Sequence, residues 1–188
     1  PIGNIDNPAE GSVRHFQRRV ALKPFQAKWK VGIFVDADRM DEPAWYAAPD
    51  GAAHMLIRDG KRSRKLLRSI STDGGATWST PVFTDYPDAT SKTFAGRLSN
   101  GVYYLVNNPN PAGRNPLAIS FSKDGQLFSE PRSVRRNAPR PRFHTSRSGG
   151  SFQYPHAVEA GGSLWIIYST NKEDIEITEV MLRDLPVR

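Results

Sequence analysis

The sequence contains no cysteine among its 188 residues, which excludes disulfide bonds and thiolate metal sites. It has no apolar run of about 20 residues, the length that a membrane-spanning helix needs. No stretch shows a convincing helical periodicity of apolar residues, so long amphipathic helices are not expected. What is present, 38% hydrophobic residues with a mean hydropathy of −0.55, fits one globular domain of ordinary size.

No metal or cofactor site is predicted either. The four histidines, His15, His54, His144 and His156, do not pair at the spacing of zinc ligands. No aspartate pattern matches a calcium-binding loop, and no nucleotide-binding or nucleophile-elbow motif occurs. The chain starts at Pro1 without a signal peptide, so we expect a processed product or a fragment.

The charge balance is basic, with 26 Lys and Arg against 19 Asp and Glu and a net charge of +7. Such a balance favours an anionic partner, which could be a nucleic acid, an acidic surface or an acidic sugar. Six arginines lie between Arg132 and Arg147, in a segment that is also rich in proline and glycine. We interpret this segment as a long basic loop, either simply solvated or able to attract an anion.

The most informative stretch is the eight-residue segment 71–78, which reads S-x-D-x-G-x-T-W. Gly74 and Gly75 can adopt the positive φ that a tight hairpin turn requires. Asp73 can accept backbone N–H groups within its own turn, and Trp78 can fold back beneath it. We expect Trp78 to be buried there, and its replacement by alanine to cost roughly 3–5 kcal/mol.

A shorter version of this turn follows at residues 124–131, with Asp124 placed 51 positions after Asp73 and Phe128 in the role of Trp78. Around these turns, short β-type runs repeat three times, over residues 42–86, 92–136 and 153–182. Repeats of about 40–50 residues with four short strands each are typical of β-propeller blades. The predicted fold is therefore all-β, a partial propeller of about three four-stranded blades, with residues 1–35 as connecting or outer-strand material.

Three blades are too few to close a propeller ring, which usually needs about four to eight. The open sheets would expose edges and one face of a core. We therefore expect the missing propeller half, or a second copy of the chain, to cover them.

Segment 71–78 is an Asp-box, and the chain resembles the C-terminal half of a sialidase-superfamily propeller from about Asp41 to Leu182. The resemblance rests on four segments: Asp41-Glu42-Pro43, Arg58 at the end of a strand, Asn107-Asn108-Pro109 with Gly113-Arg114, and Tyr154 before the strand Leu164–Tyr168. It implies six blades in the whole propeller and a secreted or periplasmic location.

The resemblance also implies catalytic roles. Arg58 and Arg114 would bind the carboxylate of an acidic sugar, since guanidinium groups bind carboxylates bidentately and stay charged. A neutral Tyr154 would be the nucleophile, because that carboxylate would repel an anionic one. Glu42 would take the proton from Tyr154. These four residues are expected to converge at one end of the central channel.

Three alternatives stay open. Pro155 and His156 follow Tyr154 where the family usually has serine and a small or acidic residue, and His156 is a further catalytic candidate. This departure allows a related propeller that acts on uronic acid or rhamnose linkages as a hydrolase or lyase, or a glycan-binding propeller without catalysis. Nucleic-acid binding through the basic loop ranks last, and no membrane association is expected.

Overall fold

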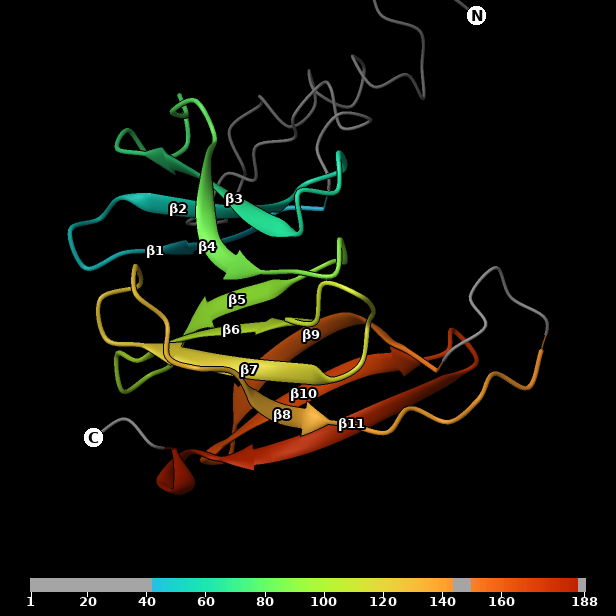
Figure 1. Ribbon diagram of the computed structural model, residues 1–188. Coiled ribbons are helices and arrows are strands. Elements are labelled where there is room, and N and C mark those ends of the chain that lie inside the picture. The colour runs from blue at the N-terminus through green and yellow to red at the C-terminus, as the bar shows by residue number, and fades with distance from the viewer. Residues whose placement is uncertain (1–41, 144–149, 186–188) are drawn as a thin grey trace, which may run out of the picture. The chain divides into compact units, whose positions relative to one another are not determined.

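The computed structural model describes residues 42–143 and 150–185, and these form three antiparallel sheets with no α-helix (Figure 1). The expected connecting segment 1–35 lies outside these residues. Sheet A contains β1 (Ala44–Ala47), β2 (Ala53–Arg58), β3 (Lys65–Ser71) and β4 (Val82–Pro87). Sheet B contains β5 (Phe94–Arg97), β6 (Tyr103–Asn107), β7 (Leu117–Ser122) and β8 (Arg132–Arg135).

Sheet C contains β9 (Phe152–Ala160), β10 (Ser163–Thr170) and β11 (Asp174–Met181), followed by the 3₁₀ turn Leu182–Asp184. Strands that are consecutive in sequence are hydrogen-bonded neighbours in every sheet. The prediction of an all-β partial propeller is confirmed, but the third sheet has three strands within the described residues instead of four. No helix in this part of the chain is long and apolar enough to cross a membrane.

Sheet B is buried on both faces, because every residue of β6 and β7 is buried. Successive side chains of a strand point to opposite faces, and β6 shows this directly. Tyr103 and Leu105 pack with β1, β2 and β3 of sheet A, whereas Tyr104 and Val106 pack with β9 and β10 of sheet C. Each buried aromatic or large aliphatic side chain contributes about 1.5–3 kcal/mol. Two apolar cores therefore hold the three sheets face to face.

The other face of sheet C carries exposed apolar side chains. Trp165 pairs with Val158, and Ile167 pairs with Ile177. Cross-strand partners share a face, and all four of these side chains are exposed. Apolar patches of this kind mark a surface that another element covers.

The Asp-box turn connects β3 to β4, the third and fourth strands of sheet A. The Ser71 hydroxyl donates to Asp73 Oδ1 at 2.7 Å and accepts the Gly75 N–H at 2.9 Å. Asp73 also accepts the Thr77 N–H at 2.9 Å and the Thr77 hydroxyl at 2.6 Å. These bonds satisfy the polar groups of the turn locally, which explains why the motif needs hydroxyl and carboxylate side chains at these positions.

The turn between β7 and β8 repeats this arrangement with one residue fewer. The Ser122 hydroxyl donates to Asp124 Oδ1 at 2.8 Å and accepts the Gly125 N–H at 2.9 Å. Asp124 Oδ1 then accepts the N–H groups of Gln126 and Leu127. The second turn has no counterpart of Thr77. Its aspartate therefore accepts two backbone N–H groups, whereas Asp73 accepts one N–H and one hydroxyl group from Thr77.

Trp78 and Phe128 are less buried than predicted, because both side chains are only half-buried. The Trp78 indole N–H donates to the Gly75 carbonyl at 3.2 Å, so the ring lies against its own turn. Phe128 packs edge-on against Tyr86 and Tyr46 at the margin of the core between sheets A and B. Each ring anchors its turn while one side stays in contact with solvent.

Replacing Trp78 by alanine should therefore lower the free energy of unfolding by about 1–2 kcal/mol, since only part of a large side chain leaves a packed environment. Urea denaturation monitored by circular dichroism measures this difference. Leu127→Ala is the control: it lies in the second turn, is 76% exposed, and should change stability by less than about 0.5 kcal/mol. A loss of about 3 kcal/mol or more at Trp78 would indicate full burial.

Asp73 should make the stability depend on acid pH. Bonds from the Thr77 hydroxyl and N–H, and then from the Ser71 hydroxyl, lower the pKa of Asp73 from 3.8 to about 2. A lowered pKa stabilises the fold above the unfolded value and loses that contribution as pH falls through the folded value. The difference in melting temperature between wild type and Asp73→Asn should be constant above about pH 5 and vanish toward pH 2. A difference that persists unchanged at pH 2 would contradict this.

Candidate functional site

The antiparallel order of the strands sends alternate connections to opposite edges of the three sheets. One edge holds the residues before β1 and the connections β2–β3, β4–β5, β6–β7, β8–β9 and β10–β11, and we call it the site edge. The other holds both Asp-box turns and the connections β1–β2, β5–β6 and β9–β10. In Figure 1 the site edge lies on the right, where the orange and red connections of sheet C can be followed. All five predicted site residues lie at or near the site edge.

Residues with positive φ, the left-handed backbone conformation, are of different types at the two edges. The described residues contain eight non-glycine residues with positive φ, and all eight lie at the site edge: Glu42, Arg62, Arg64, Thr90, Asn137, Tyr154, Asn171 and Lys172. The seven glycines with positive φ all lie at the opposite edge. Non-glycine residues rarely adopt this conformation, and such strain gathers at functional sites. The site edge therefore keeps side chains where the backbone alone would favour glycine.

Glu42 and Arg58 contact each other, although 16 positions separate them. Arg58 Nη1 lies 2.8 Å from Glu42 Oε2, and the two side chains are 21% and 35% exposed. Arg58 ends β2, whereas Glu42 precedes β1, which pairs with β2. Partial exposure screens such a pair, so it contributes little to stability. Its result is an ordered carboxylate beside an ordered guanidinium at one end of sheet A.

Arg114 lies in the β6–β7 connection and is 8% exposed. Its Nη2 donates to the Thr90 carbonyl of the β4–β5 connection at 3.2 Å. Its own carbonyl accepts the Phe152 N–H at 2.8 Å, which ties this connection to the start of β9. Arg114 therefore lies where sheets B and C meet at the site edge.

Tyr154 lies in a bulge of β9, where the pairing with β10 shifts between Ile167 and Ser169. Its φ of 54° re-aims the side chain, as bulges do near active sites. The side chain is 41% exposed, and Lys172 Nζ lies 5.5 Å from the ring centroid, a cation–π contact. Lys172 is held there by the β10–β11 turn, in which Asn171 and Lys172 both have positive φ.

His156 lies two residues beyond Tyr154 on the same strand, and its side chain is exposed. Its ring stacks on Phe94 of β5, with 4.1 Å between the ring centroids. This contact links the first strands of sheets B and C. His156 is therefore oriented by an aromatic partner, whereas Tyr154 faces a cation.

The structure joins Glu42 to Arg58 and ties the backbone of Arg114 to β9. Among residues 42–143 and 150–185, no hydrogen bond joins Glu42 to Tyr154. Sequence reasoning overlooked two cations of the site edge, Lys172 and Lys92. Lys92 lies two residues before β5, as Glu42 lies two residues before β1. Aligning the blades on their Asp-boxes, which are 51 positions apart, matches Glu42 with Thr93 and would have drawn attention to the adjacent Lys92.

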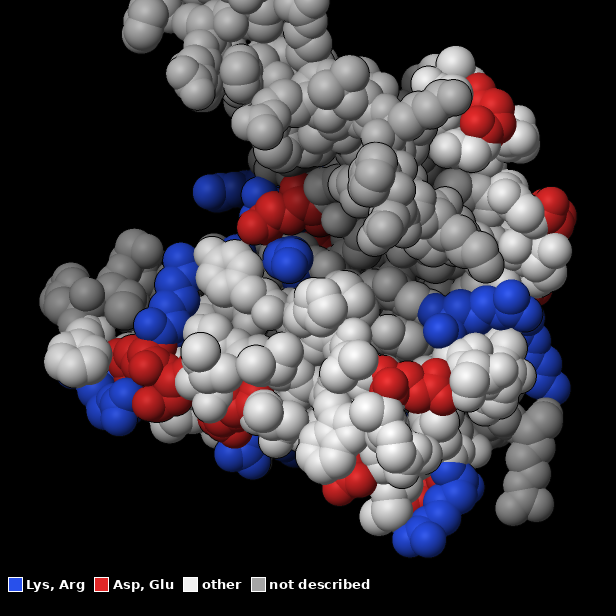
Figure 2. All heavy atoms as spheres, turned by 180° about the vertical axis from the view of Figure 1, so that it is seen from behind, with Lys and Arg blue, Asp and Glu red and all other residues white. Residues whose placement is uncertain are grey.

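The basic segment between Arg132 and Arg147 is partly neutralised within the chain. Arg135 pairs with Glu176 at 3.1 Å, and Arg142 pairs with Asp174 at 2.7 Å. The Glu173 carboxylate also accepts the N–H groups of residues 142 and 143. Figure 2 shows Lys and Arg interspersed with Asp and Glu over the face it presents. Arg147 and His144 lie outside the described residues.

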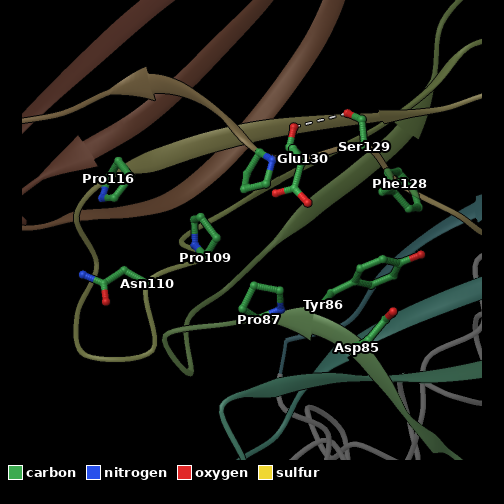
Figure 3. Close-up of a pocket in the computed structure, with 10 residues that line it drawn as sticks. Asp85, Tyr86, Pro87, Pro109, Asn110, Pro116, Phe128, Ser129 and Glu130 are labelled. Carbon is green, nitrogen blue, oxygen red and sulfur yellow. Dashed lines mark hydrogen bonds between the residues drawn. The ribbon is translucent and has the colours of Figure 1, made fainter.

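A cavity of about 500 Å³ lies elsewhere, between β4 of sheet A and the connections of sheet B. Its walls are rigid prolines and the rings of Tyr86 and Phe128, with the Glu130 side chain between them (Figure 3). The Tyr86 hydroxyl donates to the Gln126 carbonyl, which fixes the ring. None of the predicted site residues lines this cavity.

Comparison with known proteins identifies the fold family. Residues 13–167 match the family described as BNR repeat-like domain. A solved structure described as "Sialidase" is 32% identical, with a TM-score of 0.61, and the match covers 81% of this chain and 14% of that one. The comparison with curated proteins found no match.

Two further structures are less than 25% identical and show the fold alone. The intramolecular trans-sialidase from Ruminococcus gnavus is 18% identical with a TM-score of 0.57, and the match covers 78% of this chain and 33% of that one. The α-L-arabinanase from Penicillium chrysogenum is 16% identical with a TM-score of 0.52, covering 77% of this chain and 47% of that one. This chain thus spans less than half the length of each relative. The chain belongs to the BNR repeat-like family within the sialidase superfamily of β-propellers.

Proposed function

We propose that this chain is part of a glycoside hydrolase that removes terminal acidic sugars, with Tyr154 as the nucleophile and Glu42 as its general base. The observation that carries the proposal is the contact of 2.8 Å between Glu42 and Arg58 at the site edge. The three cations Lys92, Arg114 and Lys172 lie in connections of the same edge. Together they provide positive charge for a carboxylate ligand and an ordered carboxylate for proton transfer.

The proposed reaction begins with attack of the Tyr154 phenolic oxygen on the anomeric carbon. The phenolic proton passes to Glu42 as the bond to the leaving sugar oxygen breaks. This transfer needs the two oxygen atoms within about 3 Å, a contact that often tightens only when substrate binds. Arg58 and Arg114 would hold the sugar carboxylate and orient the ring. A general acid for the leaving group would come from the blades that this chain does not contain.

We also propose that activity requires those further blades. The exposed apolar face of sheet C, with Trp165 and Ile167, offers a surface for a neighbouring blade or for a second copy of the chain. A closed ring would cover this face and complete the wall of the central channel. The isolated chain is therefore expected to be inactive.

A second function has one observation in its favour. His156 stacks on Phe94, which orients an imidazole next to the Tyr154 bulge. Histidine and tyrosine side by side could serve acid–base chemistry on uronic acid linkages. In that case His156→Ala would abolish turnover of a uronic acid polymer. Tyr154→Phe would also lower this turnover, because it removes the phenolic group that takes part in the acid–base chemistry.

The first test is Tyr154→Phe in the full-length protein. This change removes only the phenolic oxygen, so turnover of a fluorogenic sialoside should fall by at least about a thousandfold. Sialic acid binding, measured by calorimetry, should change less than about threefold. Tyr86→Phe is the matched control, because the Tyr86 hydroxyl donates to the Gln126 carbonyl of the second Asp-box turn, and its turnover should equal that of wild type. Full activity of Tyr154→Phe would rule out the nucleophile role, and binding without turnover in wild type would indicate a glycan-binding propeller.

The second test concerns ligand charge. Arg114→Ala should weaken binding of an acidic sugar about 10- to 100-fold, because a charge-assisted contact is lost. Binding of the corresponding sugar amide, which lacks the charge, should be affected much less. Arg132→Ala, an exposed arginine of β8, is the control and should leave both affinities unchanged. Equal losses for the acid and the amide would show that Arg114 acts only through folding.

A further inference from the structure

A buried carboxylate lies close enough to Arg114 for the two charges to interact. Asp88 follows β4 and is 1% exposed. Its Oδ2 accepts the Ser91 N–H at 3.0 Å, and its own N–H donates to the Arg64 carbonyl at 2.9 Å. Among the described residues its Oδ1 has no hydrogen-bond partner. Burying a carboxylate is costly unless it is hydrogen-bonded and paired with a positive charge. This one belongs to neither apolar core and has no role in the proposed reaction.

The bonds of Asp88 shape the β4–β5 connection. Thr90, between Asp88 and Ser91, has a φ of 57°, and its carbonyl accepts Arg114 Nη2 at 3.2 Å. The same connection is tied to the end of β6: the Ala89 N–H donates to the Asn108 carbonyl and the Ser91 hydroxyl donates to Asn108 Oδ1. Asp88 thus closes the turn whose middle carbonyl reaches the guanidinium.

We propose that Asp88 is a positioning residue for Arg114, which it holds for an acidic ligand through the turn of the β4–β5 connection. This inference rests on the proposed function, because it assumes that Arg114 binds the ligand carboxylate. Asp88 itself would touch no substrate. Its carboxylate keeps the Thr90 carbonyl aimed at Arg114 and adds a negative charge that interacts with the guanidinium.

Protonation of Asp88 should weaken this arrangement. Burial raises the pKa of Asp88 to about 6, against the opposing effects of the Ser91 and Thr90 N–H groups, the Asn107 side chain and the charge of Arg114. Two other charged residues belong to the surrounding connections. Arg64 donates its guanidinium to the Pro111 carbonyl at 2.6 Å, and Lys92 is half-buried four residues after Asp88. A neutral Asp88 accepts the turn N–H groups less strongly and no longer attracts Arg114.

The experiment compares three variants of the full-length protein by two measurements. The first is hydrogen exchange of the Arg114 Nε–H by NMR, which needs no ligand. Asp88→Ala should raise the exchange rate at least about tenfold, and Asp88→Asn, which keeps an acceptor for Ser91, about threefold. Asp85→Ala, an exposed carboxylate of β4, should leave it unchanged. An unchanged exchange rate in Asp88→Ala would overturn the proposal.

The second measurement is the kinetics of a fluorogenic sialoside between pH 5 and pH 7. The KM of Asp88→Ala should rise about tenfold with kcat within twofold, whereas a merely structural role would lower the active fraction and hence kcat. The wild-type KM should rise about threefold on going from pH 7 to pH 5. Asp88→Asn should show this higher KM at both pH values. Identical pH profiles for wild type and Asp88→Asn would contradict the role of the Asp88 charge.

The two proposals can fail separately. If Arg114→Ala raises KM and Asp88→Ala does not, the positioning role is wrong while the proposed function stands. If Asp88→Ala loosens the Arg114 Nε–H but neither variant changes KM, Asp88 positions Arg114 and the binding role of Arg114 is wrong. If Asp88→Ala does not fold, Asp88→Asn alone decides, through its exchange rate and its loss of pH dependence.

Discussion

The packing of sheet B between two neighbours is the constraint on which the other features depend. Because β6 and β7 are buried on both faces, their side chains must fit one apolar core on each side. Tyr103 and Tyr46 meet in the first core with 5.4 Å between their ring centroids, and the Tyr46 hydroxyl donates to Gly125 in the second Asp-box turn. A Cβ at Gly125 would lie 3.1 Å from the Tyr46 ring. The core and the turn therefore constrain each other.

This face-to-face packing has a consequence for the site. Sheets that stack in the same orientation bring corresponding connections to the same edge, so residues far apart in sequence become neighbours. Glu42, Thr90 and Tyr154 lie at similar places in successive sheets and share a left-handed backbone. The opposite edge uses glycine for the same conformation, where tight turns need no side chain. The two edges thus reach the same backbone conformation with different residue types.

The basic segment and the predicted site residues hold their cations differently. The surface arginines 135 and 142 pair with acidic residues of β11 and its preceding turn, which reduces their attraction for an external polyanion. The cations around the predicted site residues contact different partners: Arg58 a carboxylate, Arg114 a backbone carbonyl and Lys172 an aromatic ring. The positions of these cations therefore say more about the ligand than the net charge of +7 does.

The sequence by itself determined the fold class, because Asp-box turns depend on local hydrogen bonds whose donors and acceptors lie within eight residues. It also indicated which edge residues to consider, since Glu42, Arg58, Arg114 and Tyr154 each adjoin a β-type run. Only the tertiary structure decided what these residues contact. The half-burial of Trp78, the cation over Tyr154 and the carboxylate of Asp88 near Arg114 all depend on how turns and connections pack in three dimensions. Strand patterns carry no information on such contacts, because period-two alternation reports the face of a side chain and not its partner.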